Sequence, residues 1–271
     1  MRSLRPLVVL PTYDEAGNIA EVLGRVRAAC PEAHVLVVDD ASPDGTAGRA
    51  EALGAGLGGV DVLRRPRKAG LGSAYREGFA WGLARGFDAL VEMDADLSHQ
   101  PEALPLLLGA LGGGVDLVIG SRYVPGGSIP NWAWHRRALS LAGNVYAAAV
   151  LGLPVRDLTS GFRAYSGAVL AGMDLSRVRA DGYGFQIEMV RAVAAAGARV
   201  VEVPITFVDR VRGRSKMSSR TIFEALALVT WWGLKGGTRR RSARRSAPPP
   251  AGAPGPAHPR WRSTEGSEVG S

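Results

Sequence analysis

The chain has 271 residues, of which 46% are hydrophobic and 21% charged. This is enough to bury a full hydrophobic core and to form an enzyme. The single Cys30 excludes an internal disulfide, and residues 1–5 lack the apolar core of a signal peptide, so we expect a protein of the reducing cytoplasm. The formal net charge of +8 is uneven, because the seven arginines and two glutamates beyond Gly237 leave the preceding body with only +3.

Short runs rich in β-branched residues alternate with helix-like segments through most of the chain. Strands are predicted at residues 7–10, 35–38, 60–63, 89–93, 117–119 and 200–203, and helices at residues 19–29, 46–53, 71–84 and 101–111. Continuous apolar strands that alternate with helices predict an α/β domain with a mostly parallel sheet flanked by helices. Ligands of such sheets bind outside the carboxyl ends of the strands, so the loops there are the candidates for chemistry.

Polar and aromatic groups follow the first two predicted strands. Tyr13 is placed to stack on a nucleobase, and Glu15 and Asp40 to accept hydrogen bonds from the base or its ribose. The nearby run Ser-Pro-Asp-Gly at residues 42–45 is also good turn chemistry without any ligand. For Asp39 and Thr46 we therefore expect structural roles, with Thr46 capping the following helix.

The strongest local signal is the acidic pair Asp94 and Asp96 at the end of the apolar run 89–93. Residues two apart on an extended chain point to the same side, so both carboxylates can face one ion. Ligand sets made only of oxygen favour a hard divalent cation such as Mg²⁺ or Mn²⁺, held together with substrate phosphates. Such a pair alone is weak evidence, because acidic pairs in loops are common, but its position after a buried strand strengthens it.

Two later segments have the composition of membrane-surface helices. Residues 138–155 carry no charge but contain Gly143, Asn144 and Pro154, so we do not expect them to span a bilayer. Residues 221–234 are too short to cross ~30 Å of hydrocarbon, yet two adjacent tryptophans beside Lys235 suit a helix that lies in the interface. We predict amphipathic interface helices at about 138–151 and 221–234, with helices docked on the protein core as the alternative.

Residues 238–271 are rich in Arg, Pro, Ser and Gly and nearly free of aliphatic residues. Such a segment cannot bury enough surface to fold, so we predict a disordered tail after a domain of residues 1–237. Five arginines between Arg239 and Arg245 are compatible with nucleic acid, with anionic lipid or with a solvated end. Because these arginines follow the predicted interface helix at 221–234, we expect no nucleic acid as a partner.

Several motifs in order along the chain match one known family. They lie at residues 11–15, 39–46, 70–72, 94–99, 120–123, 157–163 and 207–210, followed by Ser215 and Lys216. Together they resemble the dolichol-phosphate mannose synthases, also called polyprenol monophosphomannose synthases, among the family 2 glycosyltransferases. The resemblance covers about residues 7–235 and implies the GT-A fold, a Rossmann-like fold that binds nucleotide sugars.

The resemblance also implies roles for individual residues. The nucleoside would lie among Pro11, Tyr13, Glu15, Val38 and Asp40, the metal and diphosphate at Asp94, Ala95 and Asp96, and a cationic clamp would comprise Arg122, Arg210 and Lys216. Catalysis would centre on Asp96, Arg122 and Asp157. Without the resemblance, Arg210 and Lys216 would be interpreted as solvated loop charges.

Two residues near the expected site have alternative interpretations. Asp157 would orient the acceptor or help to position the metal, but an aspartate that caps a helix or forms a salt bridge fits the pattern equally well. His99 is expected beside the metal rather than on it, because Mg²⁺ and Mn²⁺ prefer oxygen ligands.

Three positions depart from the family pattern. Asp14 stands where Asn is usual, Ala41 where Gly is usual, and Gln100 interrupts a run that more often contains Pro. If the position of Ala41 needs a positive φ, either this residue carries strain or the loop has shifted.

By resemblance, the chain transfers mannose from GDP-mannose to a polyprenyl monophosphate with inversion, giving a β-linked mannosyl phosphate. The acceptor phosphate is already an oxyanion, which explains why the sequence shows no Ser-His-Asp nucleophile set. Alignment of the substrates, the metal and the cationic side chains would then supply catalysis. A lipid acceptor places the protein peripherally on the cytoplasmic face of a membrane.

Three other functions fit parts of the sequence. The same chemistry with UDP-glucose or another UDP-sugar is the nearest alternative within enzymes. A non-catalytic nucleotide- or lipid-binding regulator would be expected to have lost at least one of Asp94, Asp96, Arg122, Arg210 and Lys216. A Rossmann dehydrogenase is disfavoured, because no Gly-x-Gly-x-x-Gly motif follows the first strand.

Overall fold

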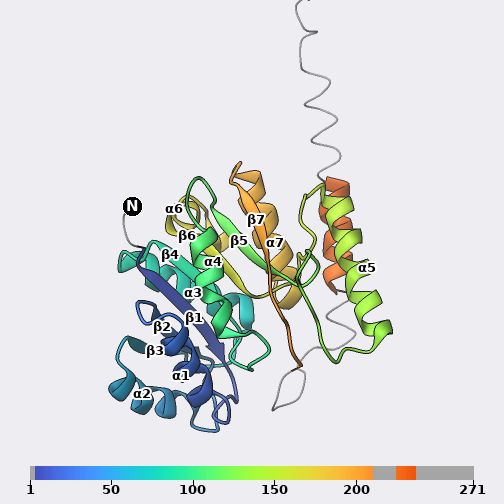
Figure 1. Ribbon diagram of the computed structural model, residues 1–271. Helices are drawn as coiled ribbons and strands as arrows, with labels where there is room; N and C mark the ends of the chain where they lie inside the picture. Colours follow the sequence, from blue (N-terminus) through green and yellow to red (C-terminus); the bar gives the residue numbers. More distant parts are fainter. Residues whose placement is uncertain (1–3, 210–223, 236–271) are drawn as a thin grey trace, which may run out of the picture.

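The computed structural model describes residues 4–209 and 224–235. Within these residues a seven-stranded sheet runs through the molecule, with helices packed on both of its faces (Figure 1). The predicted tail and the loop that contains Arg210 and Lys216 lie outside the described residues.

The sheet is mostly parallel. Its strands are β1 (Pro6–Thr12), β2 (His34–Asp39), β3 (Val60–Arg64), β4 (Ala89–Glu92), β5 (Leu117–Ser121), β6 (Arg163–Ser166) and β7 (Val200–Pro204), in the order β3-β2-β1-β4-β6-β5-β7. β6 runs antiparallel to both of its neighbours, β4 and β5, whereas the other pairs are parallel. The carboxyl ends of β1, β2 and β4 therefore meet at one edge, where ligands of such sheets bind.

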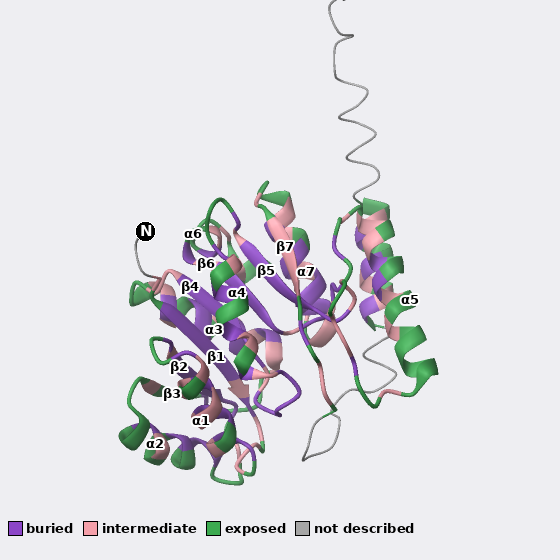
Figure 2. Ribbon diagram, viewed as in Figure 1, coloured by how far each residue is buried: buried purple, intermediate pink, exposed green. Residues whose placement is uncertain are grey.

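Helices connect most of these strands. They are α1 (Ile19–Ala29), α2 (Thr46–Leu57), α3 (Leu71–Ala84), η1 (Pro101–Ala103), α4 (Leu104–Ala110), α5 (Trp134–Leu151), α6 (Gly167–Ala171), η2 (Leu175–Arg177) and α7 (Gly182–Ala195), and residues 224–235 form a further helix. Side chains of β1 alternate between two cores: Val8 and Leu10 face the layer of α1 and α4, while Leu7 and Val9 face α3 and α7. Burial on both faces explains the continuous apolar strands (Figure 2).

All six predicted strands and all four predicted helices are present. The segment expected as one helix at 101–111 divides into η1 and α4, and the helix that begins at Thr46 extends to Leu57. Sequence patterns missed β6 and α7. β6 has only four residues and includes Arg163 and Ser166, and α7 begins with Gly182 and Gly184, which are more typical of a loop.

α5 and the helix of residues 224–235 pack against each other beyond α7 (Figure 1). The Tyr146 and Thr230 hydroxyls are 2.7 Å apart, and Gly233 lies directly against Val150. Both segments are thus helical, although α5 begins at Trp134 and residues 221–223 lie outside the described part. In the described ranges, no helix combines the length and the apolar character needed to cross a bilayer.

Candidate active site

A cavity of about 460 Å³ opens at the carboxyl ends of β1, β2 and β4. Its lining includes residues at or just after these strands, namely Pro11, Thr12, Tyr13, Glu15, Asp40, Asp94, Ala95 and Asp96. The β3–α3 loop, the loop before β6 and the start of α7 complete the wall. Loops that are distant in the sequence thus meet around one space, as the parallel sheet predicts.

The two carboxylates of the acidic pair differ in exposure. The Asp94 side chain is 34% exposed, whereas Asp96 is 7% exposed and its Oδ1 accepts a hydrogen bond from the Ser98 amide at 3.0 Å. The Tyr75 hydroxyl is 3.4 Å from Asp94 Oδ1. Leu97 adopts a φ of 64°, a left-handed conformation that turns the chain back after the pair.

His99 lies beside the acidic pair and is 2% exposed. The backbone amide of Asp94 donates a hydrogen bond to His99 Nδ1 at 3.2 Å, while the ring packs between Phe162 and Phe207. Burial lowers the pKa of His99 to about 4, so the ring is neutral near pH 7. This neutral ring supports the backbone of Asp94 without adding charge to the site.

The acidic pair fits a hard divalent cation. Both side chains are oxygen donors on the same cavity wall, and the described residues contain no group of three or more His, Cys, Asp or Glu suited to a metal. Mg²⁺ is commonly held by one or two carboxylates, with substrate phosphates and water as the other ligands. The donor set here matches that mode and does not match an all-protein structural metal site.

The expected nucleoside side of the cavity contains a cation that the sequence patterns did not indicate. Lys68 Nζ lies 3.8 Å from the centre of the Tyr13 ring. Tyr13 is the residue on which the base was expected to stack. Asp40 forms a buried ion pair with Arg65 and also accepts hydrogen bonds from two backbone amides of the β3–α3 loop, at 3.0 and 3.1 Å. Val38 is fully buried and packs against Gly78 of α3, so its side chain lies in the core.

Left-handed conformations shape the loops after β1 and β2. Asp14 has a φ of 57° and Ala41 a φ of 55°. The position of Ala41 thus has a positive φ, which alanine disfavours, whereas Asn and Asp tolerate it. Asp39 accepts hydrogen bonds from Thr12 and Ser42, so its expected structural role is confirmed. Gly45, and not Thr46, occupies the N-cap of α2.

Arg122 and Asp157 form a buried pair behind the cavity. Arg122 is 4% exposed and Asp157 is 0% exposed, with Nε–Oδ2 and Nη2–Oδ1 distances of 2.7 and 2.6 Å. Burial alone would raise the pKa of Asp157, but the charge and hydrogen bonds of Arg122 outweigh it and lower that pKa. Neither side chain is part of the cavity lining within the described residues; Arg122 reaches that lining through a 2.7 Å hydrogen bond to Thr159.

Sequence reasoning missed one whole wall of the cavity. Tyr183 and Gln186 come from the first turns of α7, Asp181 is its N-cap residue, and Thr159 and Gly161 come from the loop before β6. The segment 157–163 was singled out by resemblance, but the helix was not predicted at all. The apolar residues of α7 do recur with a helical period, but glycine occupies two of its first three positions and makes the segment look like a loop.

A second cavity, of about 130 Å³, lies between α5, α7 and the helix of residues 224–235. Its lining is mainly apolar and includes Leu139, Ala147, Ile187, Leu226 and Val229, together with Arg136. Thr159 and Tyr183 line both cavities, so the two spaces adjoin.

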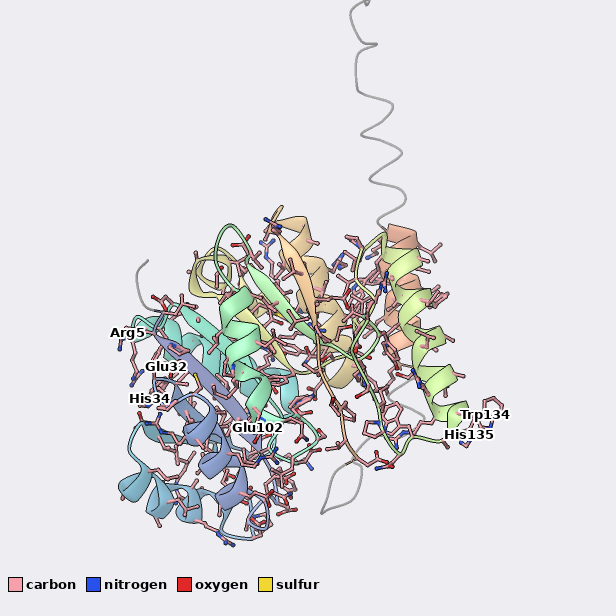
Figure 3. The ribbon with its side chains drawn as sticks, in the orientation of Figure 1. Arg5, Glu32, His34, Glu102, Trp134 and His135 are labelled. Carbon is pink, nitrogen blue, oxygen red and sulfur yellow. The ribbon has the colours of Figure 1, made fainter. Side chains whose placement is uncertain are left out.

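Large apolar side chains are exposed on the outer surface of these two helices. On α5, Trp134 is 80%, Leu139 61% and Val145 60% exposed, and beyond it Trp231 is 50% and Leu234 70% exposed. Figure 3 shows Trp134 projecting away from the sheet at the start of α5. Several large apolar side chains exposed on two neighbouring helices indicate an interaction surface.

The tryptophan pair of the second helix does not share one environment. Trp232 is 6% exposed and packs with Arg191 of α7 at 5.1 Å, whereas Lys235 lies 3.8 Å over the exposed Trp231 ring. Adjacent residues on a helix point about 100° apart, so one tryptophan joins the core and the other faces outward.

Comparisons with known proteins identify the family of the chain. Residues 7–172 match the family described as Glycosyl transferase family 2. The chain is 52% identical over 233 residues to a polyprenol monophosphomannose synthase of Mycolicibacterium smegmatis, with 86% of this chain and 88% of that protein covered. It is 53% identical over 231 residues to an undecaprenyl-phosphate mannosyltransferase of Micrococcus luteus, with 85% and 95% covered.

Solved structures show the same fold. A glucosyl-3-phosphoglycerate synthase from Mycobacterium tuberculosis, solved with Mn²⁺, UDP and glucosyl-3-phosphoglycerate, matches with a TM-score of 0.64 at 22% identity, over 84% of this chain and 79% of that one. At this identity the likeness concerns the fold alone, and it confirms the expected GT-A architecture. With the family match and the two close relatives, it follows that the chain belongs to glycosyl transferase family 2, among the polyprenyl-phosphate mannosyltransferases.

Proposed function

We propose that this protein transfers mannose from GDP-mannose to a polyprenyl phosphate at a membrane surface. The names of two relatives that are more than half identical to it support mannose as the sugar and a polyprenyl phosphate as the acceptor. The observation that carries the proposal is the adjoining of the two cavities. A cavity that contains the acidic pair suits a nucleotide sugar, and a mainly apolar cavity that shares Thr159 and Tyr183 with it suits a lipid.

The donor would bind with its base beside Tyr13 and its diphosphate at the acidic pair. Lys68 lies over one face of the Tyr13 ring, so a base that stacks on that face would displace the Lys68 side chain toward the base edge or the phosphates. Glu15 and Asp40 line the same part of the cavity and offer carboxylates to base or ribose hydrogen-bond donors.

Asp94 and Asp96 would hold Mg²⁺ or Mn²⁺. When bound, the metal would neutralise the negative charge that develops on the departing diphosphate. The structural neighbour solved with Mn²⁺ and UDP shares only the fold, so it supports the general mode and not the preferred ion.

The transfer itself needs no strong base from the protein. An oxygen of the acceptor phosphate forms the new bond to the anomeric carbon, and the bond from that carbon to the diphosphate breaks, so that GDP leaves with the electron pair. The residues align the two anions and stabilise their charge. Arg122, held in place by Asp157, contributes a fixed positive charge behind Thr159, and Arg210 and Lys216 are proposed as further cations that contact phosphate. A single displacement inverts the anomeric centre and gives the β-linked product.

The membrane would lie against the exposed apolar surface of α5 and residues 224–235. Trp134 and Trp231 are suited to the headgroup region, and Arg137 and Lys235 add positive charge on the same helices. A polyprenyl chain would reach the second cavity from that surface. We therefore place the protein peripherally on the cytoplasmic face of a membrane.

Transfer of labelled mannose from GDP-mannose to a short polyprenyl phosphate, with Mg²⁺ or Mn²⁺, tests the proposed function. Native protein should form a lipid product, and Asp96→Ala should reduce the rate at least about a hundredfold, because it removes a group that holds the charge-neutralising ion. GDP should compete with the donor better than UDP does. Stronger competition by UDP, with no product from GDP-mannose, would assign the chain to UDP-sugar transfer instead.

Sedimentation with anionic liposomes tests the membrane surface separately. Replacing Trp134 and Trp231 together by Ser should reduce liposome binding, while GDP binding remains as in the native protein. Leu57→Ser is the matched control, because Leu57 is also an exposed apolar residue, 38% exposed, but lies on α2. Equal liposome binding by the double variant and the control would contradict the proposed surface.

A further inference from the structure

One amide side chain on the α7 wall of the active-site cavity lies between the buried Glu92 carboxyl and the acidic pair. Gln186 lines the cavity, is 3% exposed, and its Oε1 accepts no hydrogen bond from any residue that the structure describes. Buried polar atoms in folded proteins nearly always have a partner. The Oε1 atom itself has no exposed surface, so a ligand in the cavity would meet the Nε2 side of this amide, which faces Gly161.

The amide of Gln186 lies beside the acidic pair. A methyl group built on Gly161 would lie 3.6 Å from Gln186 Nε2 and 3.6 Å from Asp94 Oδ2. The amide and the carboxylate therefore flank a single gap, which stays open because residue 161 has no side chain. A small polar group in this gap would contact both.

A buried arginine fixes the position of this wall. Arg163 is 0% exposed and donates from Nη1 to the backbone oxygen of Gln186 at 2.7 Å. Its Nε and Nη2 donate at 2.7 Å to the backbone oxygens of Ser160 and Leu158. One guanidinium thus ties the start of α7 to the loop that carries Gly161, and it presents the Gln186 amide from a rigid element, as recognition of a specific ligand requires.

We propose that Gln186 recognises the hexose of the nucleotide-sugar donor by hydrogen bonding to its hydroxyl groups. This inference rests on the proposed function, which places the diphosphate at Asp94 and Asp96. The group attached to that diphosphate then lies next to the gap at Gly161. A sugar hydroxyl both donates and accepts hydrogen bonds, as an amide does, so the two are complementary.

Gln186→Met tests the proposal, because it keeps the length of the side chain and removes the amide. Calorimetric titration with Mg²⁺ should give a Kd for GDP within about twofold of the native value, since GDP lacks the sugar. The Kd for GDP-mannose should rise about tenfold, the effect of one lost hydrogen bond. The ratio of kcat/KM between GDP-mannose and its 2-epimer GDP-glucose should fall toward one.

Gly161→Ala provides a second, independent variant. The new methyl group would make ordinary van der Waals contacts of 3.5 to 3.6 Å with His99, Asp94 and Gln186, so the fold should tolerate it, but the gap would be filled. GDP-mannose binding should weaken while GDP binding is kept. Gly24→Ala is the control, because it adds the same methyl group where no atom lies within 4 Å.

Three results would overturn the inference. Unchanged binding of both ligands in both variants would show that the sugar does not use this gap. An equal loss of GDP and GDP-mannose binding, with a lowered Tm, would show a purely structural role for Gln186. If native protein transfers no mannose at all, the proposed function fails and this inference fails with it, which the native control reveals before any variant is measured.

Discussion

Replacing Asp157 by Asn removes the negative charge that compensates the buried guanidinium of Arg122. Asp157 is 0% exposed and accepts three hydrogen bonds from Arg122, at 2.9 Å from the backbone amide, 2.7 Å from Nε and 2.6 Å from Nη2. Breaking a buried ion pair by changing one partner leaves an uncompensated charge and costs about 3–5 kcal/mol. Because Asn keeps one acceptor oxygen, we expect a loss near the lower limit, about 3 kcal/mol.

Thermal unfolding measures this loss. For a domain of this size, 1 kcal/mol corresponds to about 2–4 °C, so Asp157→Asn should lower Tm by roughly 6–12 °C. Arg122→Gln should destabilise by a similar amount, and the double variant by clearly less than the sum of the two, since the residues form one network. Transfer activity should fall in Asp157→Asn as well, because Arg122 loses the carboxylate that holds its guanidinium against Thr159.

A different result would refute this reasoning. If Asp157 instead acts directly on the acceptor or the metal, as its sequence context also allows, Asp157→Asn would lose activity with Tm lowered by less than about 2 °C. Additive effects of the two single variants would likewise show that the pair contributes no coupling to stability.

Burial raises the pKa of Glu92 to about 7, so the folded protein holds the proton on this side chain more tightly than the unfolded chain does. The protonated form therefore stabilises the fold fully below about pH 4.5, and this stabilisation is lost as the pH rises through 7. We expect Glu92→Gln to unfold at a higher temperature than native protein at pH 8.5, with little difference at pH 4.5. Gly78→Ala should destabilise by about 1–3 kcal/mol in urea unfolding, because the new methyl group would meet Val9 Cγ1 at 2.5 Å, whereas Gly24→Ala, with free space, should stabilise its helix by about 0.5–1 kcal/mol. Ala41→Gly should raise the free energy of unfolding by up to about 1 kcal/mol by relieving a φ of 55°, and a loss of stability would contradict the strain at this loop.

The central strands of the sheet were predictable because they are buried on both faces and rich in apolar residues. Burial on both sides produces an apolar run that needs no knowledge of its neighbours, as at Val35 and Val37 facing one core and Leu36 and Val38 facing the other. β6 was not predictable in this way. Its Arg163 is accommodated only because three backbone oxygens from other segments receive the guanidinium.

The part of the site formed by loops after β1, β2 and β4 followed from the sequence, since parallel strands bring their carboxyl ends together. The ion-pair partners of individual charged residues could not be inferred from the sequence. Arg122 and Asp157 are 35 residues apart, and no local pattern shows that they pair behind the cavity instead of facing it. The same limit applies to Lys68 over Tyr13, a contact that depends on how the β3–α3 loop folds over the β1 end.

The central claim is best tested by identifying the lipid product formed by purified native protein from GDP-mannose and a polyprenyl phosphate. Mass spectrometry should show the acceptor lipid with one added hexose, and proton NMR should show a β-anomeric mannosyl phosphate. An α-linked product would contradict the single displacement. Absence of a mannosylated lipid, together with a hexosylated lipid formed from UDP-glucose, would contradict the proposed donor.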